Sequence, residues 1–434
     1  MKHIPHISEV AACLTAFAVL TGAPAAAAPA DVNYDESKVP AYTLPDLLKM
    51  SDGSPVSDAR SWREKRRPEI LELFRTHVHG RSPAAPPRVK TTVREGVALD
   101  GKAIRRQVHL VLGDKPDCPT MDLLIYLPAG GLGPWPVFLG MNFGGNQTVH
   151  DDPGIEITSR WVRNDQTGAV TNNRASEKTR GSQASRWQIE KVLARGYATA
   201  TIYYGDLEPD FTEGWKMGVR GYYLKLADKQ DFADDDWGAI GAWAWGLSRA
   251  MDYLATDKDI DASKVVVHGH SRLGKTALWA GAQDERFAIV ISNDSGEGGA
   301  AISRRRFGEN IAHLNKNFPH WFCRNYRRYS DNETALPVDM HMLIALMAPR
   351  PVYVASAEED RWADPKGEFL AAKHAEPAYR LFGKAGLGVE DMPPVNHPVG
   401  DAIAYHIRTG KHDITEYDWE QYLNFADRHF GRKR

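Results

Sequence analysis

Apolar runs of strand length recur along this chain, and polar or helix-like stretches separate them. They lie at 135–145, 197–206, 264–270, 287–294 and 350–360. Nearly continuous apolar runs are typical of parallel strands buried on both faces, because neither face meets solvent. Residues 237–256 instead carry apolar side chains at helical spacing. The alternation predicts a three-layer αβα sandwich with a mostly parallel central sheet and right-handed crossovers.

Other segments extend or interrupt this pattern. Residues 105–113 and 121–130 suggest an antiparallel opening pair of strands, and residues 402–408 suggest a last strand. The polar segment 144–187 and the Arg- and aromatic-rich segment 303–340 are long insertions. Insertions at strand ends are where α/β proteins build their binding sites. We therefore expect both to border the functional site.

The N-terminal residues have the composition of a secretory signal. A short apolar run at 10–22 precedes small residues, and it is too short to span a bilayer. We predict a signal peptide over 1–28, an N-terminal extension over 29–95 that packs on the main domain, and a catalytic domain over 96–434. The extension contains a helix near 61–80. The protein is then exported, either periplasmic or secreted.

The net charge bears on which binding partners are expected, and the cysteine content bears on whether a disulfide can form. A formal net charge of −2 gives no reason to expect nucleic acid or a membrane surface as a partner, and we expect a monomer. Removal of the signal peptide leaves Cys118 and Cys323. Export permits a disulfide between them, but their sequence positions do not establish that they lie close together.

The stretch GHSRLGKT, residues 269–276, fits two unrelated motifs. As G-x-x-x-x-G-K-[ST] it matches a phosphate-binding P-loop, but it comes past the middle of the chain and places bulky Arg272 and Leu273 in the loop. As a nucleophile elbow it needs a strand, a tight turn with a serine, and a helix. The strand is supplied by residues 265–267, the serine by Ser271 and the helix by residues 275–283. The second glycine, Gly274, comes one position later than in G-x-S-x-G.

A hydrolase of this type also needs a base near the C-terminus, because its triad runs Ser, acid, His along the chain. His412 lies after the predicted last strand and before a helical segment, as that topology requires. His397 and His406 are the alternatives. His406 falls within the last strand, where a histidine is more often a packing residue.

Two carboxylates compete for the role of the acid, because each ends a predicted strand. Asp294 ends the run 287–294, and Asp360 ends the run 350–360. Either would hold the Nδ1 proton of His412 and stabilise the imidazolium. Position favours Asp360, and Asp294 stays open. Glu297, Glu358 and Glu359 are expected to be solvated loop charges.

Four segments carry a family resemblance. They are GHSRLGK, SNDSGEGGAAISRRRFGE, ASAEEDRWADP and YHIRTGKHDITEYDW. With them the chain resembles the bacterial glucuronoyl esterases of carbohydrate esterase family 15, over roughly residues 60–430. The resemblance implies an α/β-hydrolase fold without metal or cofactor. Such enzymes cleave the ester between 4-O-methyl-glucuronic acid on xylan and a lignin alcohol.

The resemblance also implies a role for each matching residue. Ser271 matches the nucleophile, His412 the base and Arg272 an arginine that stabilises the oxyanion. Asp294 and Asp360 match the two positions at which family members place the acid, and Asp294 departs from the usual glutamate at the first. Three further residues match those that contact the glucuronoyl sugar: Lys275, Glu309 and Trp362. Without the resemblance these three would be a surface lysine, a partner for the arginines at 304–306 and a core tryptophan.

The expected function is therefore a serine esterase that acts on glucuronoxylan or a lignin–carbohydrate ester through an acyl-enzyme. Two alternatives remain. One is another carbohydrate esterase, such as an acetyl xylan esterase. The other is a non-catalytic relative that binds glycans, which the aromatic content of 10% permits.

Overall fold

A computed structural model describes residues 32–86 and 88–432. The chain divides into two units, Met1–Val32 and the compact unit Asn33–Arg434. The predicted signal peptide lies outside the described residues. Within those residues, no helix has both the length and the apolar composition needed to cross a membrane.

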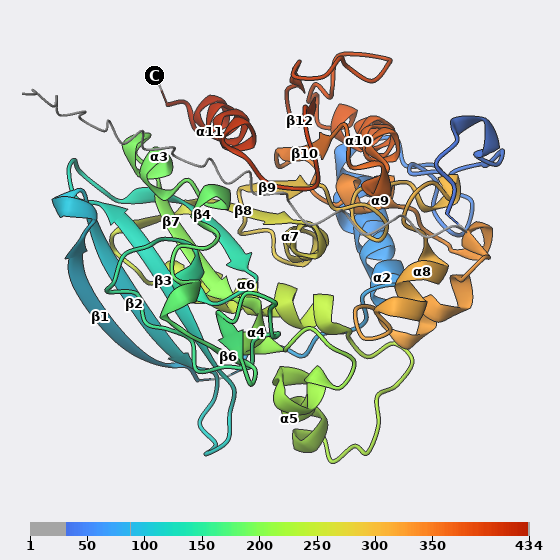
Figure 1. Ribbon diagram of the computed structural model, residues 1–434. Helices are drawn as coiled ribbons and strands as arrows, with labels where there is room; N and C mark the ends of the chain where they lie inside the picture. The colour runs from blue at the N-terminus through green and yellow to red at the C-terminus, as the bar shows by residue number, and fades with distance from the viewer. Residues whose placement is uncertain (1–31, 87, 433–434) are drawn as a thin grey trace, which may run out of the picture. The chain divides into compact units, whose positions relative to one another are not determined.

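The described part of the compact unit is built on a ten-stranded sheet in the order β1-β2-β3-β7-β4-β8-β9-β10-β12-β11 (Figure 1). The strands from β7 to β12 in this order pair in parallel, whereas β1, β2, β3 and β11 are antiparallel to their neighbours. Their bounds are Lys90–Ala98 (β1), Ala103–Val111 (β2), Thr120–Pro128 (β3), Trp135–Asn142 (β4), Ala198–Tyr203 (β7), Ile260–His270 (β8), Ile289–Asn293 (β9), Val352–Ala357 (β10), Val399–Gly400 (β11) and Ile403–Arg408 (β12).

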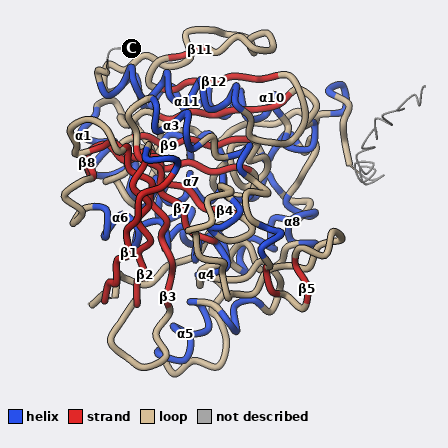
Figure 2. The backbone as a smooth tube through the Cα atoms, turned by 60° about the vertical axis from the view of Figure 1, so that its left-hand side comes forward, coloured by secondary structure: helices blue, strands red, loops and turns tan. Residues whose placement is uncertain are grey.

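Helices cover both faces of this sheet (Figure 2). Successive strand residues point to opposite faces, so Val137 and Leu139 of β4 join one apolar cluster while Phe138 joins the other. α6, α7 and α9 pack in the larger cluster, and α3 and α11 pack in the smaller one. The helix bounds are Ala59–Ser61 (α1), Arg67–His77 (α2), Ile189–Ala194 (α3), Tyr204–Leu207 (α4), Val219–Leu226 (α5), Ala239–Leu254 (α6), Arg272–Gln283 (α7), Ile311–Asn317 (α8), Met340–Ala345 (α9), Pro365–Arg380 (α10) and Glu416–Phe430 (α11). The predicted mostly parallel αβα sandwich is confirmed.

The antiparallel pair predicted at 105–113 and 121–130 is also confirmed, as β2 and β3. The sequence did not indicate β1, which begins at Lys90, inside the range predicted for the extension. All but two residues of this edge strand are exposed. The strand therefore lacks the apolar pattern by which buried strands are recognised.

The segment before β1 is anchored in the core of the same unit. Trp62, Ile70 and Phe74 are fully buried in the larger apolar cluster. Arg67 donates hydrogen bonds to the carbonyl oxygens of Leu346 and Ala282, at 3.0 and 2.9 Å. This segment therefore shares its core with α7 and α9.

The two cysteines of the described chain are both buried and unpaired. Cys118 precedes β3, whereas Cys323 lies beside the backbone of Val78, which follows α2. The disulfide that the sequence left open is not formed.

Candidate active site

The turn between β8 and α7 presents Ser271. Its backbone has φ 58° and ψ −131°, a strained conformation for a residue with a side chain. Gly269 permits the turn, because a Cβ there would lie 1.9 Å from the carbonyl oxygen of Leu273. A Cβ on Gly274 would lie 3.0 Å from the Cβ of Ser295, so the displaced glycine lets the first turn of α7 pass close to the end of β9. The stretch thus forms the strand, turn and helix of a nucleophile elbow.

Backbone N–H groups converge at the same turn. The N–H groups of Gly274 and Lys275 donate to the carbonyl oxygen of Ser271, at 2.8 and 3.2 Å. Arg272 is the first residue of α7, where an N–H has no carbonyl of its own helix to bond. This N–H adjoins the serine and is suited to receive a developing oxyanion.

His412 lies in the loop between β12 and α11. Its Nδ1 donates to Oδ2 of Asp360, just past β10, at 2.6 Å. The histidine side chain is 40% exposed, whereas Asp360 is buried. The rings of His412 and His270 have their centroids 4.5 Å apart, so His412 lies beside the residue that precedes Ser271. No hydrogen bond joins Ser271 to His412 within residues 32–432, and such contacts often tighten only when substrate binds.

The carboxylate of Asp294 lies close to the pair formed by His412 and Asp360. Ligand-type atoms of Asp294, Asp360 and His412 all lie within 4.8 Å of one another. Asp294 is fully buried, and its Oδ2 lies 3.4 Å from the guanidinium of Arg408 and 3.3 Å from the N–H of Asp413. Burial and the negative charge of Asp360 raise the pKa of Asp294 well above its ordinary value. Asp360 therefore holds the histidine, and Asp294 lies behind it.

These three side chains are of the types that bind metal ions. The imidazole Nδ1 and Asp360 are already joined by a short hydrogen bond, and the cation of Arg408 lies beside Asp294. A positive charge next to a site disfavours a second cation there. The cluster fits a proton-handling histidine with two acids better than a metal centre.

Arg272 is held over the turn by a buried carboxylate. Its Nε lies 3.2 Å from Oδ2 of Asp210, and its guanidinium is 5.3 Å from the ring centroids of both Phe143 and Trp321. Oδ1 of Asp210 accepts hydrogen bonds from Nε2 of His320 at 2.8 Å and Nε1 of Trp321 at 2.7 Å. Burial would raise the pKa of Asp210, but the bond from His320 and the charge of Arg272 hold it below its ordinary value. The arginine thus has a fixed, ionised partner.

The three predicted sugar contacts form one connected group. Nζ of Lys275 donates at 2.8 Å both to the carbonyl oxygen of Ser295 and to Oε2 of Glu309. Nε1 of Trp362 donates to the other carboxylate oxygen of Glu309, at 3.3 Å. Lys275 and Glu309 are buried, whereas Trp362 is half-buried. They are neither a surface lysine, nor a partner of the arginines at 304–306, nor a core plug.

The remaining sequence candidates lie apart from the turn or in a different environment than expected. His406 is fully buried and bonded to Asp418 and Tyr353, so the prediction of a packing residue is confirmed. His397 is exposed. The expectation of a solvated Glu297 was wrong, because that side chain is buried.

Sequence reasoning missed Asp210, His320 and Arg408. Each acts through a contact between distant segments, so no local motif marks them. The pairing of Asp210 with His320 joins positions far apart in the sequence, and only the fold brings them together.

A family model for fungal glucuronyl esterases matches residues 213–383, which include Ser271 and both acids but not His412. Carbohydrate esterase MZ0003, from an unknown prokaryotic organism, is 53% identical over 404 residues, 93% of each chain.

Two further relatives span most of the chain. A solved glucuronoyl esterase from Solibacter usitatus is 55% identical, with a TM-score of 0.86, and the match covers 91% of this chain and 100% of that one. The 4-O-methyl-glucuronoyl methylesterase of Schizophyllum commune is 27% identical over 387 residues, 87% of this chain and 82% of its own. The chain therefore belongs to the glucuronoyl esterases of carbohydrate esterase family 15, and it is a carboxylic ester hydrolase with the α/β-hydrolase fold.

Proposed function

We propose that this esterase hydrolyses esters of (4-O-methyl-)glucuronic acid that link glucuronoxylan to lignin alcohols, through a triad of Ser271, His412 and Asp360. The observation that carries the proposal is the 2.6 Å hydrogen bond from His412 to Asp360 beside the strained serine turn. The activity named for the Schizophyllum commune relative, a 4-O-methyl-glucuronoyl methylesterase, supports the uronate substrate.

The chemistry follows from these groups. Oγ of Ser271 attacks the ester carbonyl carbon while Nε2 of His412 takes its proton. Asp360 keeps Nδ1 protonated and stabilises the imidazolium. The backbone N–H and guanidinium of Arg272 stabilise the oxyanion, and loss of one such donor costs about 3 kcal/mol of the barrier. The imidazolium then protonates the leaving alcohol, and a water molecule, activated by His412, hydrolyses the acyl-enzyme.

The sugar is oriented by Lys275, Glu309 and Trp362. An esterified uronate carries no charge, so Lys275 and Glu309 act as hydrogen-bond partners for its hydroxyl groups. Their mutual bond at 2.8 Å fixes both groups in advance, which lowers the entropy lost on binding. Trp362 offers a flat apolar face to the pyranose ring.

The test is hydrolysis of a methyl or benzyl glucuronate ester by the wild type and by Ser271→Ala. We expect turnover by the wild type and a loss of at least about 10³-fold in kcat for the variant. Equal activity in the two proteins would rule out the mechanism. Faster release of acetate from acetylated xylan than of alcohol from the uronate ester would indicate an acetyl xylan esterase. Glycan binding with no turnover of either would indicate a non-catalytic relative.

A polymeric substrate of this kind lies outside the cell, so we also propose export with cleavage near residue 28. Residues 29–95 would then begin the mature chain. We propose that they fold only together with residues 96–434, since Trp62, Ile70 and Phe74 are buried in the common core. N-terminal sequencing of protein recovered outside the cytoplasm checks the cleavage, and an N-terminus at Met1 would contradict it.

A further inference from the structure

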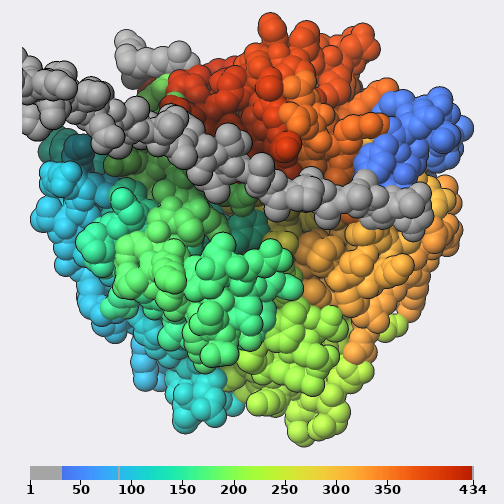
Figure 3. Space-filling view, viewed as in Figure 1, coloured from blue at the N-terminus to red at the C-terminus, as the bar shows by residue number. Residues whose placement is uncertain are grey.

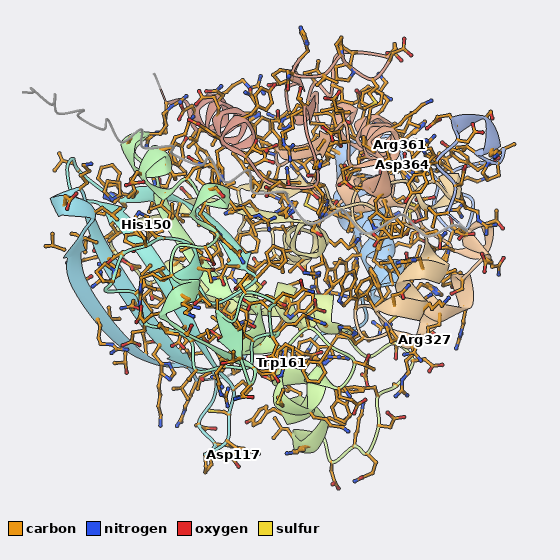
Figure 4. The ribbon with its side chains drawn as sticks, in the orientation of Figure 1. Asp117, His150, Trp161, Arg327, Arg361 and Asp364 are labelled. Atoms are coloured by element: carbon orange, nitrogen blue, oxygen red, sulfur yellow. The ribbon has the colours of Figure 1, made fainter. Side chains whose placement is uncertain are left out.

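A cavity, which we call the distal pocket, lies between the loop 112–119 and α5. Its volume is about 640 Å³, and its lining includes Lys115, Arg160, Lys216, Met217, Tyr222 and Lys225. Asp117 marks the tip of the loop in Figure 4. In Figure 3 this loop and α5 form two neighbouring projections at the lower edge of the view.

Four basic side chains and two acidic ones line the cavity. Lys115 and Lys225 are exposed, and neither forms an ion pair with any residue in 32–86 or 88–432. Lys216 pairs with Glu213, and Arg160 lies 3.8 Å from Asp206. The two acids that line the cavity are Asp117, on the loop tip, and Asp206, whose pKa is raised to about 7 by burial. An anion in the pocket would therefore meet two lysines that have no other partner.

The same cavity has an apolar side. Met217 is 56% exposed and Leu226 is 45% exposed, and both line it together with the half-buried Tyr222. Exposed large apolar side chains are few on the described surface, so two beside one cavity are notable. A ligand that satisfies both sides has an apolar ring face and a carboxylate.

The distal pocket connects to the catalytic arginine through contacts. Arg272 lies 3.2 Å from Asp210, and the next residue, Phe211, packs on Trp161 with ring centroids 4.8 Å apart. Trp161 follows Arg160, which lines the pocket. In Figure 4, Trp161 lies above the loop tip marked by Asp117. These contacts link the distal pocket to Arg272 through the half-buried rings of Trp161 and Phe211.

We propose that the distal pocket binds an unesterified uronic acid residue of the same polysaccharide whose ester is cleaved at Ser271. A free uronate has the carboxylate for Lys115 and Lys225 and the C–H face of a pyranose for Met217 and Tyr222. A neutral lignin phenol would use the apolar side alone. The identity of the ligand as a uronate rests on the proposed function. The charged and apolar residues that line the cavity are observed independently of that function. The pocket would hold the polymer, while the catalytic centre acts on a neutral ester.

The experiment uses calorimetric titration of the full protein with a glucuronoxylo-oligosaccharide that has a free carboxyl group. The variant Lys115→Glu/Lys225→Glu reverses the two unpaired charges. Lys49→Glu/Lys258→Glu is the matched control, since both of these lysines are exposed and lie outside the pocket lining. We expect the pocket variant to bind about tenfold more weakly at low salt and the control to bind like the wild type. A neutral xylo-oligosaccharide of equal length should show no difference among the three proteins.

Kinetics separate this proposal from that of the catalytic function. The pocket variant should keep the wild-type kcat and KM on a methyl glucuronate ester and lose kcat/KM only on the acidic polymer. Unchanged binding of the acidic oligosaccharide would overturn the proposal. So would equal losses for acidic and neutral sugars, or a lignin dimer whose binding depends on the apolar side chains but not on the charge. Absence of esterase activity in the wild type would instead contradict the proposed function.

Discussion

The hydrogen bond between His412 and Asp360 separates two carboxylates that the sequence could not rank with certainty. Both end strands of one sheet, and both reach the same imidazole. The choice depends on side-chain direction: Asp360 faces Nδ1, whereas Asp294 lies beside Arg408. Sequence position therefore predicts the neighbourhood of the acid, and only side-chain geometry distinguishes the two.

Asp360→Asn and Asp294→Asn should differ in effect. Asparagine at 360 cannot fix the tautomer of His412, so we expect kcat to fall by about 10³-fold or more. Burial favours the neutral form of Asp294, which asparagine resembles, so we expect a loss of less than about tenfold there. Initial rates on a methyl glucuronate ester, with thermal melts as the folding control, measure both. A larger loss at 294 would reverse the assignment.

Asp210 is expected to act through Arg272. Removal of its charge in Asp210→Asn releases the guanidinium, and we expect kcat to fall by about 10- to 100-fold with KM little changed. The double variant Asp210→Asn/Arg272→Gln should be no worse than Arg272→Gln alone, because both changes remove the same interaction. Additive losses would mean that Asp210 has a separate, structural effect.

At the scale of elements, β8, its turn and α7 fold as the sequence predicts, because glycine and a buried apolar strand leave few alternatives. β1 was not predicted because it lacks a buried apolar pattern. Its residues are mostly exposed, so its pairing with β2 depends on backbone hydrogen bonds rather than on an apolar pattern. The insertion 144–187 contains only short regular elements, which are the hairpin of Val170–Thr171 (β5) and Arg174–Ala175 (β6) and three 3-10 helices of three residues each.

Gly269→Ala tests the turn. The new Cβ would overlap the carbonyl oxygen of Leu273 and lie 2.8 Å from the nitrogen of Gly274, so the backbone would have to shift. We expect a cost of about 3 kcal/mol or more, seen as a drop in Tm of at least about 3 °C together with loss of activity. Gly130→Ala is the control, because a Cβ there meets nothing within 4 Å. Equal melting of the two variants and the wild type would contradict the geometry.

At the scale of the whole molecule, buried acids link stability to pH. Glu368 accepts hydrogen bonds from the N–H groups of Ser295 and Gly296 and from the hydroxyl of Ser356. It thereby ties the loop after β9 to α10 and β10. Burial raises its pKa to about 8, and burial raises the pKa of Glu297 to about 8 as well. The sequence shows these residues only as loop or helix charges, because the segment around 295–309 folds inward.

These raised pKa values predict that stability falls as pH rises. A carboxyl with a folded pKa of about 8 binds a proton in the native state that the unfolded chain releases near pH 4.5. The stability that this carboxyl contributes is fully present below pH 4.5. It is lost as the pH rises from there through about 8. Glu368→Gln lacks this contribution at every pH, so its Tm should fall less than that of the wild type between about pH 6 and 9. Glu64→Gln, an exposed control, should follow the wild type, and identical slopes for all three would refute the linkage.

β12 and the loop after it supply His412, the proposed base, together with the guanidinium beside Asp294 and an interior strand of the sheet. A ribosome makes these residues after the serine turn and after the strands up to β10. A nascent chain that already holds the strained serine turn therefore still lacks the proton acceptor, and its sheet has an open edge at β10. Under the proposed mechanism, hydrolysis must wait until translation has passed residue 412, and a premature stop before it yields a chain that has Ser271 but lacks the proposed base.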